Sequence, residues 1–331
     1  MRDAPDPAVL AEGVAAGERW ALARAITLVE STRADHRAAA RELLTRLGPG
    51  RGVVRVGLTG TPGVGKSSFV ESLGLRLIEA GKRLAVLAVD PSSARSGGSI
   101  LGDKTRMELL SRDPRAFIRP SPSQASLGGV GRRTREAIPL VEAWGADVIL
   151  VETVGVGQSE TMVAEMTDIF VLLIAPAGGD ELQGVKRGIM EMADLILVNK
   201  ADGELRAQAE RTRADYTGAT RLIRPPAGDP PGFPKVLCVS ALTGDGLDGA
   251  WGAVEELVSA RRANGSWDAR RREQAVSAFS RTVESGLIAR LAADPRAAAT
   301  RARLVAEVEA GRIVPDLAAE ILLDEIALRK G

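Results

Sequence analysis

Short apolar runs alternate with stretches of helical periodicity through the middle of the chain. Six runs are almost continuously apolar, at residues 53–58, 84–89, 148–151, 169–174, 195–198 and 236–239, and residues 116–118 add a shorter one. Such runs are typical of parallel strands that are covered on both faces. The segments between them are long enough for helical crossovers. The pattern predicts an α/β fold with a central, mostly parallel sheet flanked by helices.

Helical patterns flank this region on both sides. Residues 7–47 place Leu22, Ile26 and Val29 on one helical face, and after residue 249 the strand-like runs stop. We therefore expect an N-terminal helical extension (1–50), a central α/β domain (51–250) and a C-terminal helical region (251–331). A helical tail without its own core must bury its apolar faces on the central domain or on a second copy, which makes it the expected dimerisation region.

Composition narrows the class of protein. Lys plus Arg (44) nearly balance Asp plus Glu (43), so the net charge of +1 gives no reason to expect binding to nucleic acid or to an acidic membrane. The one cysteine, Cys238, lies in an apolar run and fits a reducing compartment. No apolar run approaches the ~20 residues of a membrane span, and the first six residues lack the apolar core of a signal peptide. We expect a soluble, cytoplasmic protein.

A phosphate-binding motif follows the first strand-like run. Residues 60–67 read Gly-Thr-Pro-Gly-Val-Gly-Lys-Ser, with a helical pattern beginning at Lys66. Glycines let such a loop curl around an anion with its N–H groups inward, and the helix N-terminus favours negative charge. Lys66 would reach the β- and γ-phosphates, and Ser67 would ligate magnesium. The loop residues expected against the nucleotide are Gly63, Val64, Gly65, Lys66, Ser67 and Ser68. The alternative is a glycine-rich turn with a chance Lys-Ser pair.

Three acidic residues are candidates for the surroundings of the metal ion. Asp90 and Glu152 each follow a strand-like run, and Asp103 lies in a glycine-rich, charged stretch. Carboxylates can hold magnesium directly or through water. Asp90 could equally be a turn or helix-capping aspartate, and the stretch around Asp103 could be an ordinary surface loop.

Two glycine-rich segments are candidates for switches that the γ-phosphate orders. The first is the stretch from 95 to 107. The second follows Glu152 and contains Gly155, whose amide would sense the γ-phosphate, and Gln158. Gln158 could orient water, although it does not immediately follow Gly155 as the water-positioning glutamine of Ras-like proteins does.

A guanine-reading motif follows the run at 195–198. It reads Asn199-Lys200-Ala201-Asp202. A carboxylate at Asp202 can accept hydrogen bonds from the ring N–H and the amino group of guanine, a pair that adenine does not offer, so the motif favours GTP over ATP. After the last run, Ser240, Ala241 and Leu242 would supply backbone N–H groups to the guanine oxygen.

Taken together, these segments resemble those of the MeaB/ArgK-like P-loop GTPases. The resemblance covers most of the chain, and its most specific parts are 101–107 (Leu-Gly-Asp-Lys-Thr-Arg-Met) and 180–188 (Asp-Glu-Leu-Gln-Gly-Val-Lys-Arg-Gly). It implies GTP/GDP and magnesium as ligands, a homodimer, and a partner that is an adenosylcobalamin-dependent acyl-CoA mutase, usually methylmalonyl-CoA mutase. In that family GTP hydrolysis gates cobalamin loading and protects the mutase.

The resemblance also implies roles for particular residues. Asp90, Asp103 and Glu152 would surround the metal ion with Ser67, and a third mobile segment containing Asp180, Gln183 and Lys186 would signal to the mutase. Lys186 is a candidate charge donor in catalysis. No cobalamin site is identifiable in the sequence.

Three other functions are alternatives, and each has a sequence feature or a test that separates it from a GTPase chaperone. A nickel- or cobalt-inserting GTPase would need Cys and His ligands, for which one Cys and one His do not suffice. A small-molecule P-loop kinase would have little need of a guanine motif. A binding module in which the nucleotide only helps to hold a partner would not hydrolyse GTP repeatedly.

Overall fold

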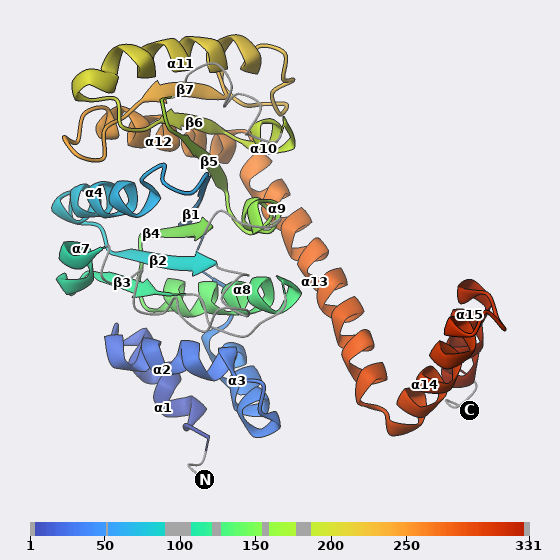
Figure 1. Cartoon of the computed structure of the whole chain (residues 1–331). Helices are drawn as coiled ribbons and strands as arrows, with labels where there is room; N and C mark the ends of the chain where they lie inside the picture. Colours follow the sequence, from blue (N-terminus) through green and yellow to red (C-terminus); the bar gives the residue numbers. More distant parts are fainter. Residues whose placement is uncertain are drawn as a thin grey trace. The chain divides into compact units, whose positions relative to one another are not determined.

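The computed structural model describes residues 4–50, 52–89, 107–120, 127–153, 159–176 and 187–327. Within these ranges a single seven-stranded sheet forms the centre of the fold (Figure 1). The strands are β1 (Val54–Gly60), β2 (Leu84–Val89), β3 (Ala116–Arg119), β4 (Val148–Thr153), β5 (Ile169–Ile174), β6 (Leu195–Val198) and β7 (Lys235–Cys238). Their order is β3-β2-β4-β1-β5-β6-β7, and every pairing is parallel. The predicted fold class is confirmed.

Alternate residues of each strand enter different cores, which is why the strands read as continuous apolar runs. In β2, Leu84 and Val86 face one core, whereas Ala85 and Leu87 face another. The first core includes α4 (Lys66–Glu79), α7 (Glu108–Arg112) and α12 (Leu247–Ala263). The opposite face is covered by α8 (Leu127–Ala143), α9 (Ser159–Ala164), α10 (Arg187–Met192) and α11 (Arg206–Thr220).

The N-terminal extension consists of α1 (Pro7–Ala15), α2 (Arg19–Glu30) and α3 (Ala34–Leu47). The predicted face of Leu22, Ile26 and Val29 is fully buried. These side chains share one hydrophobic core with α8 and with the strands beneath it, and Figure 1 shows the three helices on the outer side of α8. The extension therefore completes a layer of the central domain.

The C-terminal helices are α12, α13 (Ser266–Ala293), α14 (Pro295–Glu309) and α15 (Pro315–Ala327). The chain divides into two compact units, Met1–Arg272 and Glu273–Gly331. The first unit includes α12, because Leu247, Leu257 and other apolar residues of α12 are buried in the core of the sheet. None of the helices in the described ranges combines the length and apolarity that crossing a lipid bilayer requires.

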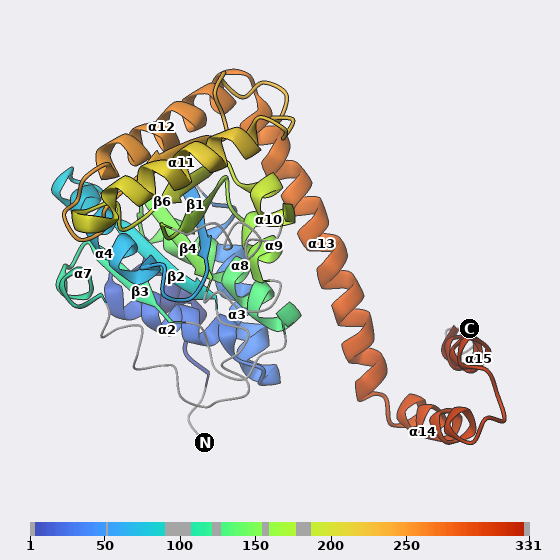
Figure 2. The ribbon, with the colours of Figure 1, turned by 45° about the horizontal axis from the view of Figure 1, so that its top comes forward.

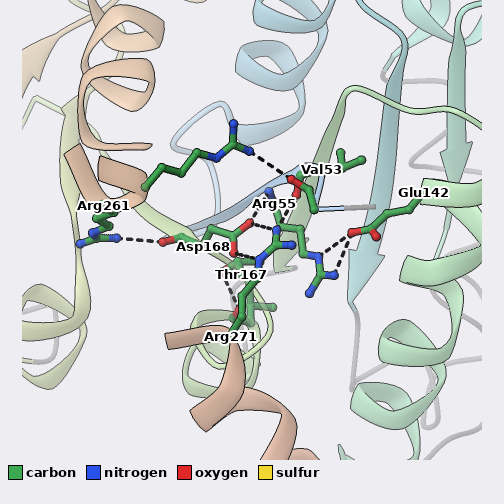
Figure 3. Close-up of polar contacts among 10 residues, drawn as sticks. Val53, Arg55, Glu142, Thr167, Asp168, Arg261 and Arg271 are labelled. Atoms are coloured by element: carbon green, nitrogen blue, oxygen red, sulfur yellow. Dashed lines mark hydrogen bonds and ion pairs between the residues drawn. The ribbon is translucent and has the colours of Figure 1, made fainter. Parts of the chain in front are cut away.

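A network of buried charges joins the amino ends of β1 and β5 to α12 and the first turns of α13 (Figure 3). Arg271 donates to both carboxylate oxygens of Asp168, each at 2.7 Å, and the backbone N–H of Arg55 donates to Asp168 at 2.8 Å. Arg261 donates to the backbone oxygen of Asp168 at 2.9 Å and pairs with Asp194. The network covers the amino ends of these strands, and the phosphate loop lies at the opposite, carboxyl ends.

Arg261 is the most buried cation of this network, with 3% of its side chain exposed. It also pairs with Asp229 at 2.7 Å. Burial alone would lower the pKa of the guanidinium, but the hydrogen bonds that it donates to Asp229 and the charge of Asp194 outweigh burial and raise that pKa. The arginine is therefore charged at neutral pH.

We expect Arg261→Met to destabilise the protein strongly. The substitution leaves Asp194 and Asp229 buried without their cation, a loss of about 3–5 kcal/mol in the free energy of unfolding. Chemical denaturation measures it. The matched control is Arg46→Met, which removes an exposed pair with Glu42 on α3 and should change stability by less than about 1 kcal/mol. Equal effects of the two substitutions would contradict this role.

Cys238, in the apolar run of β7, packs against the core between β6, β7 and α11 as a small apolar residue. Burial, followed by the charge of Glu210, raises the pKa of the thiol to about 11.

Alkylation of Cys238 should therefore be slow in the native protein. At pH 8 only about one thiol in a thousand would be ionised, and the thiolate is the reactive form. Mass spectrometry after timed exposure to iodoacetamide, with the urea-unfolded chain as control, measures the rate. Similar rates in the native and unfolded chains would disprove the assignment.

Candidate nucleotide-binding site

The phosphate-loop sequence lies between β1 and α4, where the sequence places it. Gly63 and Gly65 have φ of +81° and +91°, in the left-handed region that favours glycine. At Gly60, a Cβ atom would lie 2.4 Å from the carbonyl oxygen of Leu173 in β5. The neighbouring strand therefore restricts this position to glycine. The loop returns the chain to the amino end of α4, with the N-terminus of that helix facing the site where a phosphate would bind.

Lys66 lies inside the loop at the start of α4. Its Nζ donates to the carbonyl oxygens of Gly60 at 2.6 Å and Thr61 at 3.1 Å. Burial lowers the pKa of Lys66, while the charges of Glu152 and Glu160 oppose that shift. Phosphate oxygens would offer this ammonium group stronger, charged acceptors than the two carbonyls.

Asn199 connects the phosphate loop to the loop after β7. The side chain is 1% exposed. Its Nδ2 donates to the carbonyl oxygen of Val64 at 2.9 Å, and its Oδ1 accepts from the backbone N–H of Ala241 at 3.0 Å. A Cβ atom at Gly65 would lie 2.7 Å from the same Nδ2. Asn199 therefore holds the two loops in register.

Lys200, next to Asn199 in the loop after β6, adds a second contact to the phosphate loop. Its backbone has φ of +60°, a left-handed conformation that is uncommon for a residue other than glycine. In this conformation Nζ donates to the carbonyl oxygen of Gly63 at 2.7 Å. Local backbone strain of this kind persists where the surrounding contacts fix it, often at binding sites.

Asp202 is oriented by Ser240. The Ser240 hydroxyl donates to Oδ2 of Asp202 and accepts from the backbone N–H of Thr243 at 3.0 Å. Ser240 itself is fully buried. The carboxylate is thus positioned before any ligand binds, as discrimination between bases requires.

These residues surround a cavity of 490 Å³. Its lining residues are Gly65, Ser68, Glu71, Ser72, Asn199, Lys200, Asp202, Leu205, Ala241 and Leu242. Leu242 is 85% exposed, which leaves its side chain free to pack against a base at the rim. The cavity runs from the phosphate loop to the carboxylate of Asp202.

Oxygen ligands for a magnesium ion are present near the loop. Ser67 lies in the first turn of α4, and Glu152 is buried near the carboxyl end of β4, next to β1. A hydroxyl and a carboxylate are donors that magnesium accepts. No cluster of three or more His, Cys, Asp or Glu suited to a metal ion occurs among the residues that the structure describes. The remaining candidates, Asp90, Asp103, Gly155, Gln158, Asp180, Gln183 and Lys186, lie outside those residues.

Sequence reasoning missed three residues that line the cavity: Glu71, Ser72 and Leu205. Ser72 donates to the carbonyl oxygen of Ala241 at 2.6 Å and so connects α4 to the loop after β7, here called the base-side loop. Glu71 and Ser72 follow Ser68 by one helical turn, so the helical period after the phosphate-loop motif could have indicated them.

Comparison with known proteins decides the family. The model of the family described as "Methylmalonyl Co-A mutase-associated GTPase MeaB" matches residues 22–296. The chain belongs to the MeaB family. Membership makes it a P-loop GTPase that binds guanine nucleotide, in agreement with the geometry around Asn199 and Asp202.

Relatives in bacteria and animals support the MeaB assignment. A probable GTPase of Mycobacterium tuberculosis is 52% identical over 95% of this chain and 94% of that protein. The mouse protein named methylmalonic aciduria type A homolog, mitochondrial, is 46% identical over 94% of this chain and 77% of its own length. The crystal structure of a protein named LAO/AO transport system kinase is similar with a TM-score of 0.77, at 36% identity and 99% coverage of both chains.

We expect Asp202→Asn to change which base this MeaB protein binds. The carboxamide cannot accept both guanine hydrogen bonds, but it can donate to the 2-oxo group of xanthine. Affinity for GDP should fall by at least about ten-fold and affinity for xanthosine diphosphate should rise. Titration with both nucleotides measures this. Asp245→Asn, a substitution in the loop after β7, is the control and should keep the wild-type preference. Unchanged selectivity in Asp202→Asn would rule out the assigned role.

Proposed function

We propose that this chain is a GTP-hydrolysing chaperone that gates the loading of adenosylcobalamin into a cobalamin-dependent acyl-CoA mutase, with methylmalonyl-CoA mutase as the first candidate. The match to the MeaB family model, whose description names association with that mutase, carries the proposal. The names of the mouse and Caenorhabditis elegans relatives refer to methylmalonic aciduria, which supports the same client.

The proposed reaction transfers the γ-phosphoryl group of GTP to water. Such transfer depends on positioning and on neutralisation of charge more than on covalent catalysis. Lys66 supplies positive charge beside the phosphates, and Ser67 and Glu152, with Asp90 and Asp103, would hold a magnesium ion that supplies the rest. Asp202 holds the base, so that the phosphates enter the loop in one register.

Hydrolysis is expected to be slow in the free protein and faster with the client. Gln158, Asp180, Gln183 and Lys186 belong to the proposed switch segments, which the mutase would bring into their active arrangement. This coupling would make the nucleotide state a signal that the client reads.

The experiment is co-purification with candidate acyl-CoA mutases, with the rate of GTP hydrolysis measured with and without each one. We expect a stable complex with one mutase and several-fold faster turnover. Lys66→Ala, which removes the cation in the loop, should abolish the stimulated rate. Equal turnover with and without every mutase tested would contradict the proposal.

A homodimer is the second part of the proposal. On α13, Val276, Phe279, Val283 and Leu287 recur at helical spacing and are all exposed, Phe279 by 70%. Such an apolar face is typical of a surface that another chain covers.

Phe279→Glu should therefore shift the protein from dimer to monomer while leaving its affinity for GDP unchanged, because a charge on this face opposes its burial. Analytical ultracentrifugation measures the mass. Ser285→Glu, on the other side of α13, is the control and should leave the dimer intact. A wild-type protein that is monomeric at high concentration would overturn this part.

The structurally similar protein bears the name of a transport-system kinase, so phosphoryl transfer to a small molecule is the second candidate function. The fate of the γ-phosphate separates the two. Free phosphate equal to the GDP formed supports hydrolysis, whereas a labelled acceptor with little free phosphate supports a kinase.

A further inference from the structure

Glu71 lies where the nucleotide cavity meets the start of α7. It is in the second turn of α4, one turn beyond Ser67. Its Oε1 accepts from the backbone N–H of Leu109 at 2.8 Å and from that of Leu110 at 3.5 Å. The same half-buried side chain lines the nucleotide cavity. These N–H groups fix one carboxylate oxygen, and thereby the direction of the side chain.

The position of Glu71 corresponds to the middle of a bound nucleotide. The phosphates lie at the loop, next to Gly65 and Lys66, and the base lies at Asp202. The ribose must therefore lie between these two ends. On the α4 side, the cavity is lined by Ser68, Glu71 and Ser72. One helical turn advances by about 5.4 Å, so a residue one turn beyond the phosphate-binding residues reaches the sugar.

The chemistry of the ligand gives this carboxylate a specific partner. A guanosine polyphosphate has few hydrogen-bond donors: the N1–H and amino group of the base, and the two ribose hydroxyls. Asp202 accepts from the base. A carboxylate accepts hydrogen bonds and cannot donate them when ionised. The backbone N–H groups that meet Oε1 stabilise the charge of Glu71, and Oε2 is left to accept from a donor of the ligand.

We propose that Glu71 is a ribose-binding and sugar-selecting residue, with Oε2 accepting a hydrogen bond from a ribose hydroxyl while Oε1 holds the start of α7. The described part of the chain gives Oε1 two donors and gives Oε2 no hydrogen-bond partner. Acidic side chains bind ribose hydroxyls in the same manner in dinucleotide-binding folds. Because α7 depends on the same carboxylate, the sugar and α7 share one anchor.

The inference rests on guanine-nucleotide binding and does not depend on the mutase. The test is the equilibrium affinity of the full-length protein, with magnesium, for GDP, 2′-deoxy-GDP and 3′-deoxy-GDP. In the wild type we expect at least one deoxy analogue to bind about ten-fold more weakly, as for loss of a charge-assisted hydrogen bond. In Glu71→Ala, GDP should bind more weakly and the deoxy penalty should disappear.

Two variants separate a sugar contact from a purely structural role. Glu108→Ala changes the first turn of α7 outside the cavity and should keep the wild-type ratio of GDP to deoxy-GDP affinity. Should Glu71→Ala fail to fold, Glu71→Gln retains an oxygen for the N–H of Leu109 but loses the charge, and the ratio should shrink.

A wild-type protein that binds all three nucleotides equally well would overturn the proposal, as would a penalty that persists in Glu71→Ala. A purely structural role would lower thermal stability and leave the ratio unchanged. Failure of the mutase to bind would leave these ratios untouched, so the two failures are distinguishable.

Discussion

The buried side-chain amide of Asn199 joins the two halves of the nucleotide site. It donates to the carbonyl oxygen of Val64 in the phosphate loop and accepts from the N–H of Ala241 in the base-side loop. Since both partners are backbone groups, the distance between the phosphate subsite and the base subsite is set by one planar group. Lys200 adds a second contact to the phosphate loop, at the carbonyl oxygen of Gly63. Guanine recognition and phosphate binding are thus one rigid arrangement at the carboxyl ends of the strands.

The amino ends of the strands, opposite the nucleotide site, are stabilised by buried ion pairs. There Asp168, just before β5, accepts from the backbone of β1 and from Arg271, while Arg261 connects the same region to Asp194 (Figure 3). Arg261 lies in α12, which packs against the sheet (Figure 2). Removing one member of such a buried network leaves uncompensated charge, so the network favours a single arrangement of α12 and the sheet.

Local patterns predicted most of the fold. The strands β2, β5 and β6 begin and end where the apolar runs do, because a strand covered on both faces is apolar at every position along its length. Helical periodicity was less informative about which elements pack against one another. It shows that α12 has an apolar face but not that this face packs in the core of the sheet, within the compact unit that extends to Arg272.

Within the site, motifs predicted the individual residues but not the contacts between them. Asn199 and Val64 are 135 positions apart, and no spacing rule shows that they meet. The phosphate-loop pattern itself stops at Ser67, and Glu71 is indicated only when the helical period of α4 is followed one turn beyond it. The roles of Asp90, Asp103, Gly155, Gln158, Asp180, Gln183 and Lys186 stay predictions.

The most direct test of the site is the affinity of Asn199→Ala for GDP, measured at equilibrium and expressed per folded molecule. Without the amide, the carbonyl of Val64 and the N–H of Ala241 lose their partners and the two loops lose their register. Affinity should fall by about ten- to hundred-fold. A folded Asn199→Ala protein that binds GDP as tightly as the wild type would contradict a site built around this residue.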